Sequence, residues 1–273
     1  MKEKVARILI AAVFLPLFVW LVSLNNTFYY NILIVVSLLV ALIEYHIMLR
    51  KAGILTNLPL NILLLGVVFC SIAVPKAVCF IPSGINSVIA VLAVYSVFLL
   101  ILPLFSKDIK HAVSSMAFTL FGAFYIVVLG MGFVLIRNHG VYETLFLFGA
   151  VWIYDSAAYF IGTAFGKHKF TVLISPKKSL EGLFGGIAVC VVAAVIIKVM
   201  FGNRFIPFEL GQTVFYAVII SLSAQCGDLT ESMIKRFCGV KDSSNLVPGH
   251  GGVLDKADSF LFAAPLFVIL MSL

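Results

Sequence analysis

The chain has 273 residues, of which 62% are hydrophobic and only 11% are charged, and its formal net charge is +7. Its mean hydropathy of +1.15 lies far above the range of water-soluble globular domains, which excludes a soluble enzyme and indicates an integral membrane protein. The five cysteines are scattered and form no C-x-x-C pair, so a disulfide framework and a zinc site have no support.

Nine apolar segments are long enough to cross a bilayer, because a hydrocarbon core about 30 Å thick needs about 20 apolar residues per helix. The first has a basic start like a signal peptide, but no small-x-small cleavage site follows it, so we expect a retained span. The sequence therefore predicts an all-α, polytopic membrane protein with about nine transmembrane helices. The predicted spans are residues 8–24, 28–48, 58–75, 84–105, 112–135, 143–163, 183–201, 212–229 and 254–272.

The basic residues of the loops predict the orientation of these spans. With the N-terminus in the cytoplasm, 15 of the 19 lysines and arginines fall on the cytoplasmic side and 4 on the other. Cytoplasmic loops carry the lysine and arginine excess, so we expect a cytoplasmic N-terminus and a C-terminus outside. The net charge then reflects topology and attraction to anionic lipid headgroups, with no nucleic-acid partner.

Polar residues are distributed unequally along the chain. Residues 1–141 hold five nearly featureless spans, predicted to be a scaffold, in which Glu44 and His46 of "LIEYHIM" are the ionisable residues well inside a span. A structural role and a functional role both stay open for that pair, since intramembrane charges tend to be functional. Residues 142–273 hold four spans and three polar blocks, and we predict that they form the catalytic region, with the active site at the cytoplasmic side.

Carboxylates of the third polar block suggest a metal site. Asp228 and Lys235 share one helix face with Glu231, Ser232 and Arg236, and Asp255 and Asp258 share one face at the start of the last span. Helix capping would explain Asp255, but not Asp258, one turn further in, where an unpaired charge is costly. A hard divalent cation is bound well by a small number of carboxylates that leave positions for water and phosphate oxygens. The predicted ligands are therefore Asp228, Asp255 and Asp258.

Two loops have the composition of phosphate-binding segments. Pro248, Gly249, Gly251 and Gly252 break any helix and allow an anion-binding nest of backbone N–H groups that presents His250, although an ordinary loop has the same residues. "SPKKSLEG" adds Lys177 and Lys178, for which topology and phosphate binding are equally good explanations.

Other residues of the second half have simpler interpretations. Asp155, inside the sixth span, is a candidate site residue, with pairing to a lysine as the alternative. The pairs Gly162–Gly166 and Gly182–Gly186 have the small-x-x-x-small spacing of closely packed helices.

The run from Ser232 to Asp258, with "KDSS" and "PGHGGVLDKAD", closely resembles the C-terminal signature of the phosphatidate cytidylyltransferases, also called CDP-diacylglycerol synthases. "GDLTES", "ISPKKSLEG" and "DSAAYFIG" are similar to stretches of bacterial members, so the resemblance covers the whole chain. The chain departs from the family pattern at Lys256, where arginine is usual, and at Ser244 and Asn245. Lysine keeps the charge but loses the bidentate fork of arginine.

The resemblance implies transfer of a cytidylyl group from CTP to phosphatidate in a bacterial-type inner membrane, with Mg²⁺ and room for a second, monovalent cation. Membrane lipids are the implied surroundings, and a homodimer is one option for assembly. Asp228, Asp255, Asp258 and Lys235 would be the catalytic residues, with the three aspartates on the metal. CTP phosphates would contact Arg236, Lys241, His250, Gly251 and Gly252, and Lys177 and Lys178 would bind CTP or the phosphatidate headgroup.

Two other functions are compatible with parts of the pattern. A CTP-dependent lipid kinase would transfer the γ-phosphate to an alcohol and release CDP in place of pyrophosphate. A secondary transporter would use Asp155, Asp228 and Asp258 as an ion relay near the midplane. The transporter is less favoured because the carboxylates crowd one side and the two halves show no inverted repeat.

Overall fold

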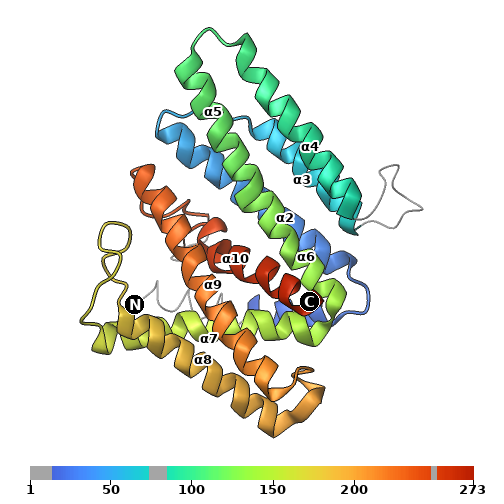
Figure 1. Cartoon of the computed structure of the whole chain (residues 1–273), viewed down its shortest axis with the longest axis vertical. Helices are drawn as coiled ribbons and strands as arrows, with labels where there is room; N and C mark the ends of the chain where they lie inside the picture. The colour runs from blue at the N-terminus through green and yellow to red at the C-terminus, as the bar shows by residue number, and fades with distance from the viewer. Residues whose placement is uncertain (1–13, 74–84, 247–250) are drawn as a thin grey trace.

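The computed structural model describes residues 14–73, 85–246 and 251–273, and within these ranges the chain folds into helices joined by short loops (Figure 1). A short helix over Phe14–Ser23 precedes the labelled elements. Three irregular segments interrupt the α-helices: η1 Leu102–Phe105, the π-helix η2 Ala123–Val128 and η3 Gly202–Arg204. The α-helices are α2 Phe28–Lys51, α3 Leu58–Ala73, α4 Ile85–Ile101, α5 Ile109–Gly122, α6 Leu129–His139, α7 Val141–Phe165, α8 Leu180–Phe201, α9 Leu210–Phe237 and α10 Leu254–Ser272.

The prediction of an all-α, polytopic membrane protein is confirmed. Six helical segments of the described ranges are long and apolar enough to cross a membrane. Every predicted span overlaps a helix: Phe14–Ser23 and Leu58–Ile72 are shorter apolar helices, and Ile109–His139 is one continuous rod made of α5, η2 and α6. The number of nine crossings stays a prediction, as does the side of the membrane on which the loops lie.

Helices α7 and α8 form a closely packed hairpin, as the glycine spacing predicts. A Cβ atom added to Gly182 would lie 3.1 Å from the Cα atom of Gly162 and 2.8 Å from the carbonyl oxygen of Ala158. Apolar side chains gain little from meeting one another in lipid, so helices in a membrane depend on such close packing. The small residues therefore fix how α7 and α8 cross, and with them the loop of residues 166–179 between the two helices.

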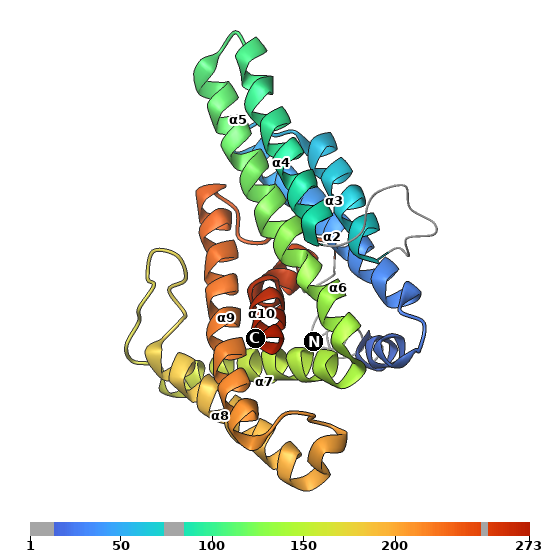
Figure 2. The same ribbon diagram turned by 45° about the vertical axis from the view of Figure 1, so that its right-hand side comes forward.

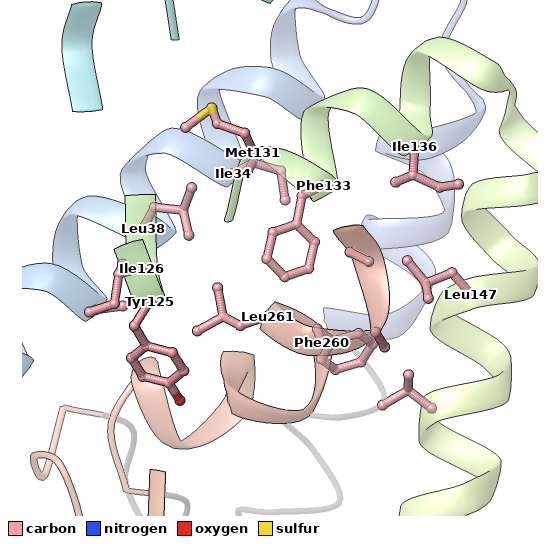
Figure 3. Close-up of a cluster of buried hydrophobic side chains, with 14 of the residues drawn as sticks. Ile34, Leu38, Tyr125, Ile126, Met131, Phe133, Ile136, Leu147, Phe260 and Leu261 are labelled. Atoms are coloured by element: carbon pink, nitrogen blue, oxygen red, sulfur yellow. The ribbon is translucent and has the colours of Figure 1, made fainter. Parts of the chain in front are cut away.

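Helix α10 lies in the middle of the molecule, against α9 on one side and α6 on the other (Figures 1 and 2). Its apolar side chains join a buried cluster with residues of the first half (Figure 3). The two predicted regions, 1–141 and 142–273, therefore share one core, and their boundary stays a prediction. The residues labelled in that cluster are Ile34, Leu38, Tyr125, Ile126, Met131, Phe133, Ile136, Leu147, Phe260 and Leu261.

Candidate active site

The C-terminal end of α9 is tied to the first turn of α10 through Lys235. The Nζ atom of Lys235 lies 2.7 Å from Oδ1 of Asp255 and forms an ion pair with Glu231, one turn earlier on α9. Glu231 is fully buried, and Lys235 is the one described residue that pairs with its carboxylate, so Lys235 provides its charge compensation. Removing Lys235 would leave the buried Glu231 without its ion-pair partner, which is costly away from water, and would take one partner from Asp255.

Asp255 holds the loop that leads into α10. Its Oδ2 atom accepts hydrogen bonds from the backbone N–H of Ser243 at 2.9 Å, the hydroxyl of Ser243 at 2.7 Å and the N–H of Gly252 at 2.7 Å. A carboxylate with several donors is a good organiser of backbone at a helix start. The geometry supports the capping interpretation of Asp255, and its role as a metal ligand stays a prediction.

Asp258 lies where α9 and α10 approach most closely. Gly227 permits the approach, because a Cβ atom there would lie 3.1 Å from the Cα atom of Ser259. The Asp258 side chain is 92% buried, and its Oδ1 atom accepts the N–H of Ser259 at 2.7 Å. Capping therefore does not account for Asp258. Its charged neighbours include Asp228 on α9, Asp155 on α7 and Lys235.

The loop of residues 166–179 contributes a lysine to the same place. Lys178 lies 2.8 Å from Oδ2 of Asp228, whose Oδ1 atom accepts the hydroxyl of Ser232 at 3.3 Å. Asp155 has Asp228, Lys178 and Lys256 as its charged neighbours. Among the described residues no ion pair joins Asp155 to a lysine, so the structure does not support that alternative. Lys178 belongs to the predicted site, and its charge and that of Asp228 act on Asp155.

Together these groups form the carboxylate–lysine cluster, in which five carboxylates and three ammonium groups leave a formal charge of −2. An excess of negative charge in a partly buried cluster is costly unless a cation or a proton compensates it. The hard oxygen donors fit Mg²⁺, which proteins usually hold by one or two carboxylates and substrate phosphates. Within the described ranges no three acidic, histidine or cysteine side chains are arranged to hold a metal unaided. The cluster consists of Asp155, Asp228, Glu231, Asp255, Asp258, Lys178, Lys235 and Lys256.

Glu44 reaches this region from α2 and answers the question that the sequence left open. It is 96% buried and accepts the backbone N–H groups of Val253 at 3.0 Å and Leu254 at 2.8 Å. The hydroxyl of Ser244 donates to Oε1 at 2.6 Å, and the Ser243 hydroxyl, whose single proton is shared with Asp255, lies 3.2 Å from Oε2. These hydrogen bonds stabilise the negative charge of Glu44, and the positive end of the α10 helix dipole favours it as well. A residue of the predicted scaffold therefore anchors the signature loop.

The other predicted nucleotide contacts are more scattered. The Arg236 guanidinium donates to the carbonyl oxygens of Ile174 at 3.2 Å and Val240 at 3.3 Å, so it joins α9 to the loop of residues 166–179. Lys177 and Lys241 are exposed. Gly251 has the positive φ of +84° that the predicted nest requires. His250, Pro248 and Gly249 lie outside the described residues.

Gly252 is a glycine because of its surroundings. A Cβ atom there would lie 2.5 Å from Oε1 of Glu44 and would collide with the hydroxyl of Ser243. Its N–H donates to Asp255, so it organises the loop and does not point outward as a free anion-binding group.

His46 belongs to a separate polar network in the first half. Its Nδ1 atom lies 2.5 Å from the Thr56 hydroxyl, and Asn61 donates to Nε2 at 3.1 Å. Tyr95 completes the network through Asn61. His46 therefore joins α2, α3 and α4, and its hydrogen bonds to described residues lie outside the carboxylate–lysine cluster.

Comparison with protein families matches residues 5–273 to a model described as the cytidylyltransferase family. This chain belongs to the cytidylyltransferase family. The match covers nearly the whole chain, from the first predicted span to the end of α10, so the family resemblance inferred from the signature is confirmed.

Several curated relatives of this family member carry the name phosphatidate cytidylyltransferase. The one from Staphylococcus epidermidis is 41% identical over 155 residues, which cover 57% of this chain and 58% of that protein. The one from Staphylococcus haemolyticus is 40% identical over 157 residues, covering 57% and 58%. The matched part thus spans a little over half the length of these relatives.

The prediction from sequence missed the roles of Glu44 and Glu231. Glu231 shares a helix face with Asp228 and Lys235, and this pattern could have identified it as a site residue. For Glu44 the signal was an uncompensated carboxylate inside a span, which does not reveal its partners 199 to 210 residues away.

Proposed function

We propose that this protein transfers the cytidylyl group of CTP to phosphatidate and releases pyrophosphate, forming CDP-diacylglycerol for membrane phospholipid biosynthesis. The observation that carries the proposal is the carboxylate–lysine cluster, which gathers side chains from α7, α9, α10 and the α7–α8 loop in a member of the cytidylyltransferase family. The names of the relatives point to the same reaction.

The reaction joins two phosphate anions that repel each other. An oxygen of the lipid phosphate attacks the α-phosphorus of CTP, the bond from that phosphorus to the bridging oxygen breaks, and pyrophosphate leaves with the bonding electrons. The attacking oxygen is already anionic, so a strong general base is not needed. Alignment and charge neutralisation are the main tasks, and fixed charged groups perform them well.

The residues of the cluster divide these tasks. Lys178 and Lys235 place ammonium groups beside acidic side chains, from which each can turn to a phosphate oxygen. The proposed contacts of the substrate phosphates are Lys177, Arg236, Lys241, His250 and Gly251, whereas the N–H of Gly252 is occupied by Asp255. Asp255 and Glu44 hold the loop that carries several of these groups, and so fix where the nucleotide can lie.

The proposed ligands of Mg²⁺ are Asp228, Asp255 and Asp258, and one divalent ion would balance the formal charge of −2. A second, monovalent cation remains part of the proposal. Bound Mg²⁺ would neutralise phosphate charge and hold the triphosphate in place. Asp255 would then share a carboxylate that already accepts four hydrogen bonds.

The predicted orientation places this chemistry at the cytoplasmic side of a bacterial inner membrane, with the N-terminus in the cytoplasm. CTP would then arrive from the cytosol and phosphatidate from the bilayer, at the end of α9 and the start of α10. The proposed contacts all come from one chain, so the site does not require a homodimer, although a homodimer would not disturb it.

The test is a turnover assay in detergent micelles with phosphatidate, Mg²⁺ and CTP labelled at the α-phosphate. Asp258→Asn is compared with Asp108→Asn, the same substitution at the exposed N-cap of α5, where asparagine caps as well as aspartate. We expect label in the lipid with the wild type and Asp108→Asn, and a loss of about 100-fold or more with Asp258→Asn. Equal activity of the two variants would remove Asp258 from the site, and no labelled lipid with the wild type would refute the function.

A further inference from the structure

The hydroxyl of Tyr125 is a buried polar group without a partner. Tyr125 is 99% buried, and its oxygen makes no hydrogen bond in the part of the chain that the structure describes. A buried hydroxyl loses its hydrogen bonds to water and normally finds a replacement in the protein. The comparable tyrosine Tyr30, also fully buried, donates to the carbonyl oxygen of Phe133 at 3.0 Å. Tyr125 therefore needs an explanation that Tyr30 does not.

Tyr125 belongs to the π-helix η2, which interrupts the rod of α5 and α6. A π-helical turn adds a residue to the turn and changes the direction in which its side chains point, and such segments are frequent at functional sites. Figure 3 shows the ring at the edge of the buried apolar cluster, with its oxygen pointing away from Ile126 and Leu38. The hydroxyl is thus directed out of the apolar core.

The charged neighbours of Tyr125 are the carboxylates of the cluster. Asp258 is the foremost of them, followed by Glu231 and Asp228. The ring also meets Phe262 edge to face, with 6.3 Å between ring centroids. Phe262 lies one turn after Asp258, on the same face of α10. The Phe262 contact therefore brings the ring of Tyr125 to the face of α10 that carries Asp258.

One carboxylate oxygen of Asp258, Oδ2, can still accept a hydrogen bond. Its Oδ1 atom takes the N–H of Ser259, whereas its Oδ2 atom has no hydrogen bond to a described residue. A phenol is a neutral donor at physiological pH, and a carboxylate is the strongest acceptor available to it. Donation from Tyr125 would fix the direction of the Asp258 carboxylate, as groups around metal ligands commonly do.

We propose that Tyr125 is a positioning residue of the carboxylate–lysine cluster, whose hydroxyl donates to Asp258 when a divalent cation binds there. This inference rests on the proposed function for its effect on turnover, but its effect on cation binding is independent of turnover. In this proposal the π-helix η2 orients the hydroxyl of Tyr125 toward the carboxylate–lysine cluster.

The test compares Tyr125→Phe with Tyr30→Phe, because each substitution removes one buried hydroxyl and keeps the ring. Thermal unfolding without ligand comes first. Tyr125→Phe should unfold at the wild-type temperature or above it, since it removes an unpartnered group, and Tyr30→Phe should unfold lower because it loses a hydrogen bond. A lower unfolding temperature for Tyr125→Phe would show that its hydroxyl is partnered in the resting protein, and would contradict the proposal.

Cation binding follows, with Mn²⁺ as a paramagnetic substitute for Mg²⁺ and free Mn²⁺ measured by electron paramagnetic resonance. Tyr125→Phe should bind Mn²⁺ about 10- to 100-fold more weakly than the wild type, whereas Tyr30→Phe should bind it normally. Unchanged affinity in Tyr125→Phe would overturn the proposal, even if the wild type turns over CTP. A wild type that binds Mn²⁺ but makes no CDP-diacylglycerol would instead refute the proposed function and leave Tyr125 to be judged on affinity.

Discussion

Replacement of Glu44 by glutamine tests whether the first half of the chain shapes the active site. The carboxylate accepts two backbone N–H groups at the start of α10 and two serine hydroxyls. An amide can still accept on its oxygen, but its NH₂ group would face the N–H of Leu254, which would lose its partner. One lost hydrogen bond to a charged group costs about 1.5–3 kcal/mol. Glu44→Ala loses all four and should cost about 3–5 kcal/mol.

The matched control is Glu209→Gln, the same substitution at the N-cap of α9, where the side chain forms a capping box far along the helix from the site. We expect it to cost about 1 kcal/mol or less and to leave catalysis unchanged. Thermal unfolding gives the stability of each variant, and initial rates give KM for CTP and for phosphatidate separately.

Glu44→Gln should raise KM for CTP by about ten-fold or more while KM for phosphatidate stays near the wild-type value, because the displaced loop carries the proposed nucleotide contacts. If Glu44→Gln lowers the unfolding temperature and leaves both KM values unchanged, Glu44 stabilises the fold without shaping the site, and the reasoning fails.

Three further predictions concern the same region. Lys178→Met removes the partner of Asp228 and should lower kcat/KM by about 100-fold. The free energy of unfolding should change by about 1 kcal/mol at most, because Asp228 is partly exposed. A rate within two-fold of the wild type would exclude Lys178 from the site. Gly252→Ala forces a Cβ atom against Glu44 and Ser243 and should cost about 1–3 kcal/mol in chemical unfolding, whereas the open position Gly211→Ala should not; equal stability of the two variants would contradict this packing. Removal of divalent cations with EDTA should abolish turnover and added Mg²⁺ should restore it, and full activity in EDTA would refute the metal requirement.

The helical architecture could be predicted from the sequence because membrane spans depend on local properties. Apolar runs of about 20 residues and the glycine spacing between α7 and α8 are readable within one window of the chain. The helical relation of Asp228, Glu231 and Lys235 is equally local, which is why the face they share was predicted correctly.

The partners of individual carboxylates could not be predicted in the same way. Glu44 meets a loop about 200 residues later in the chain, and the π-helix that contains Tyr125 leaves no clear mark in the sequence "AFYIVV". Asp255 was expected to bind metal because its acidic neighbours were visible, whereas its donors from Ser243 and Gly252 depend on how the intervening loop folds back. Contacts between distant segments require the fold.

The most direct test of the central claim is the fate of the two labels of CTP in a reaction that offers the purified wild-type protein both phosphatidate and an alcohol acceptor, diacylglycerol. One reaction contains CTP labelled at the α-phosphate and a second contains CTP labelled at the γ-phosphate. Cytidylyl transfer predicts that the α-label enters the lipid while the γ-label appears in pyrophosphate, in equal amounts. Entry of the γ-label into the lipid with release of CDP would contradict the account and identify a lipid kinase.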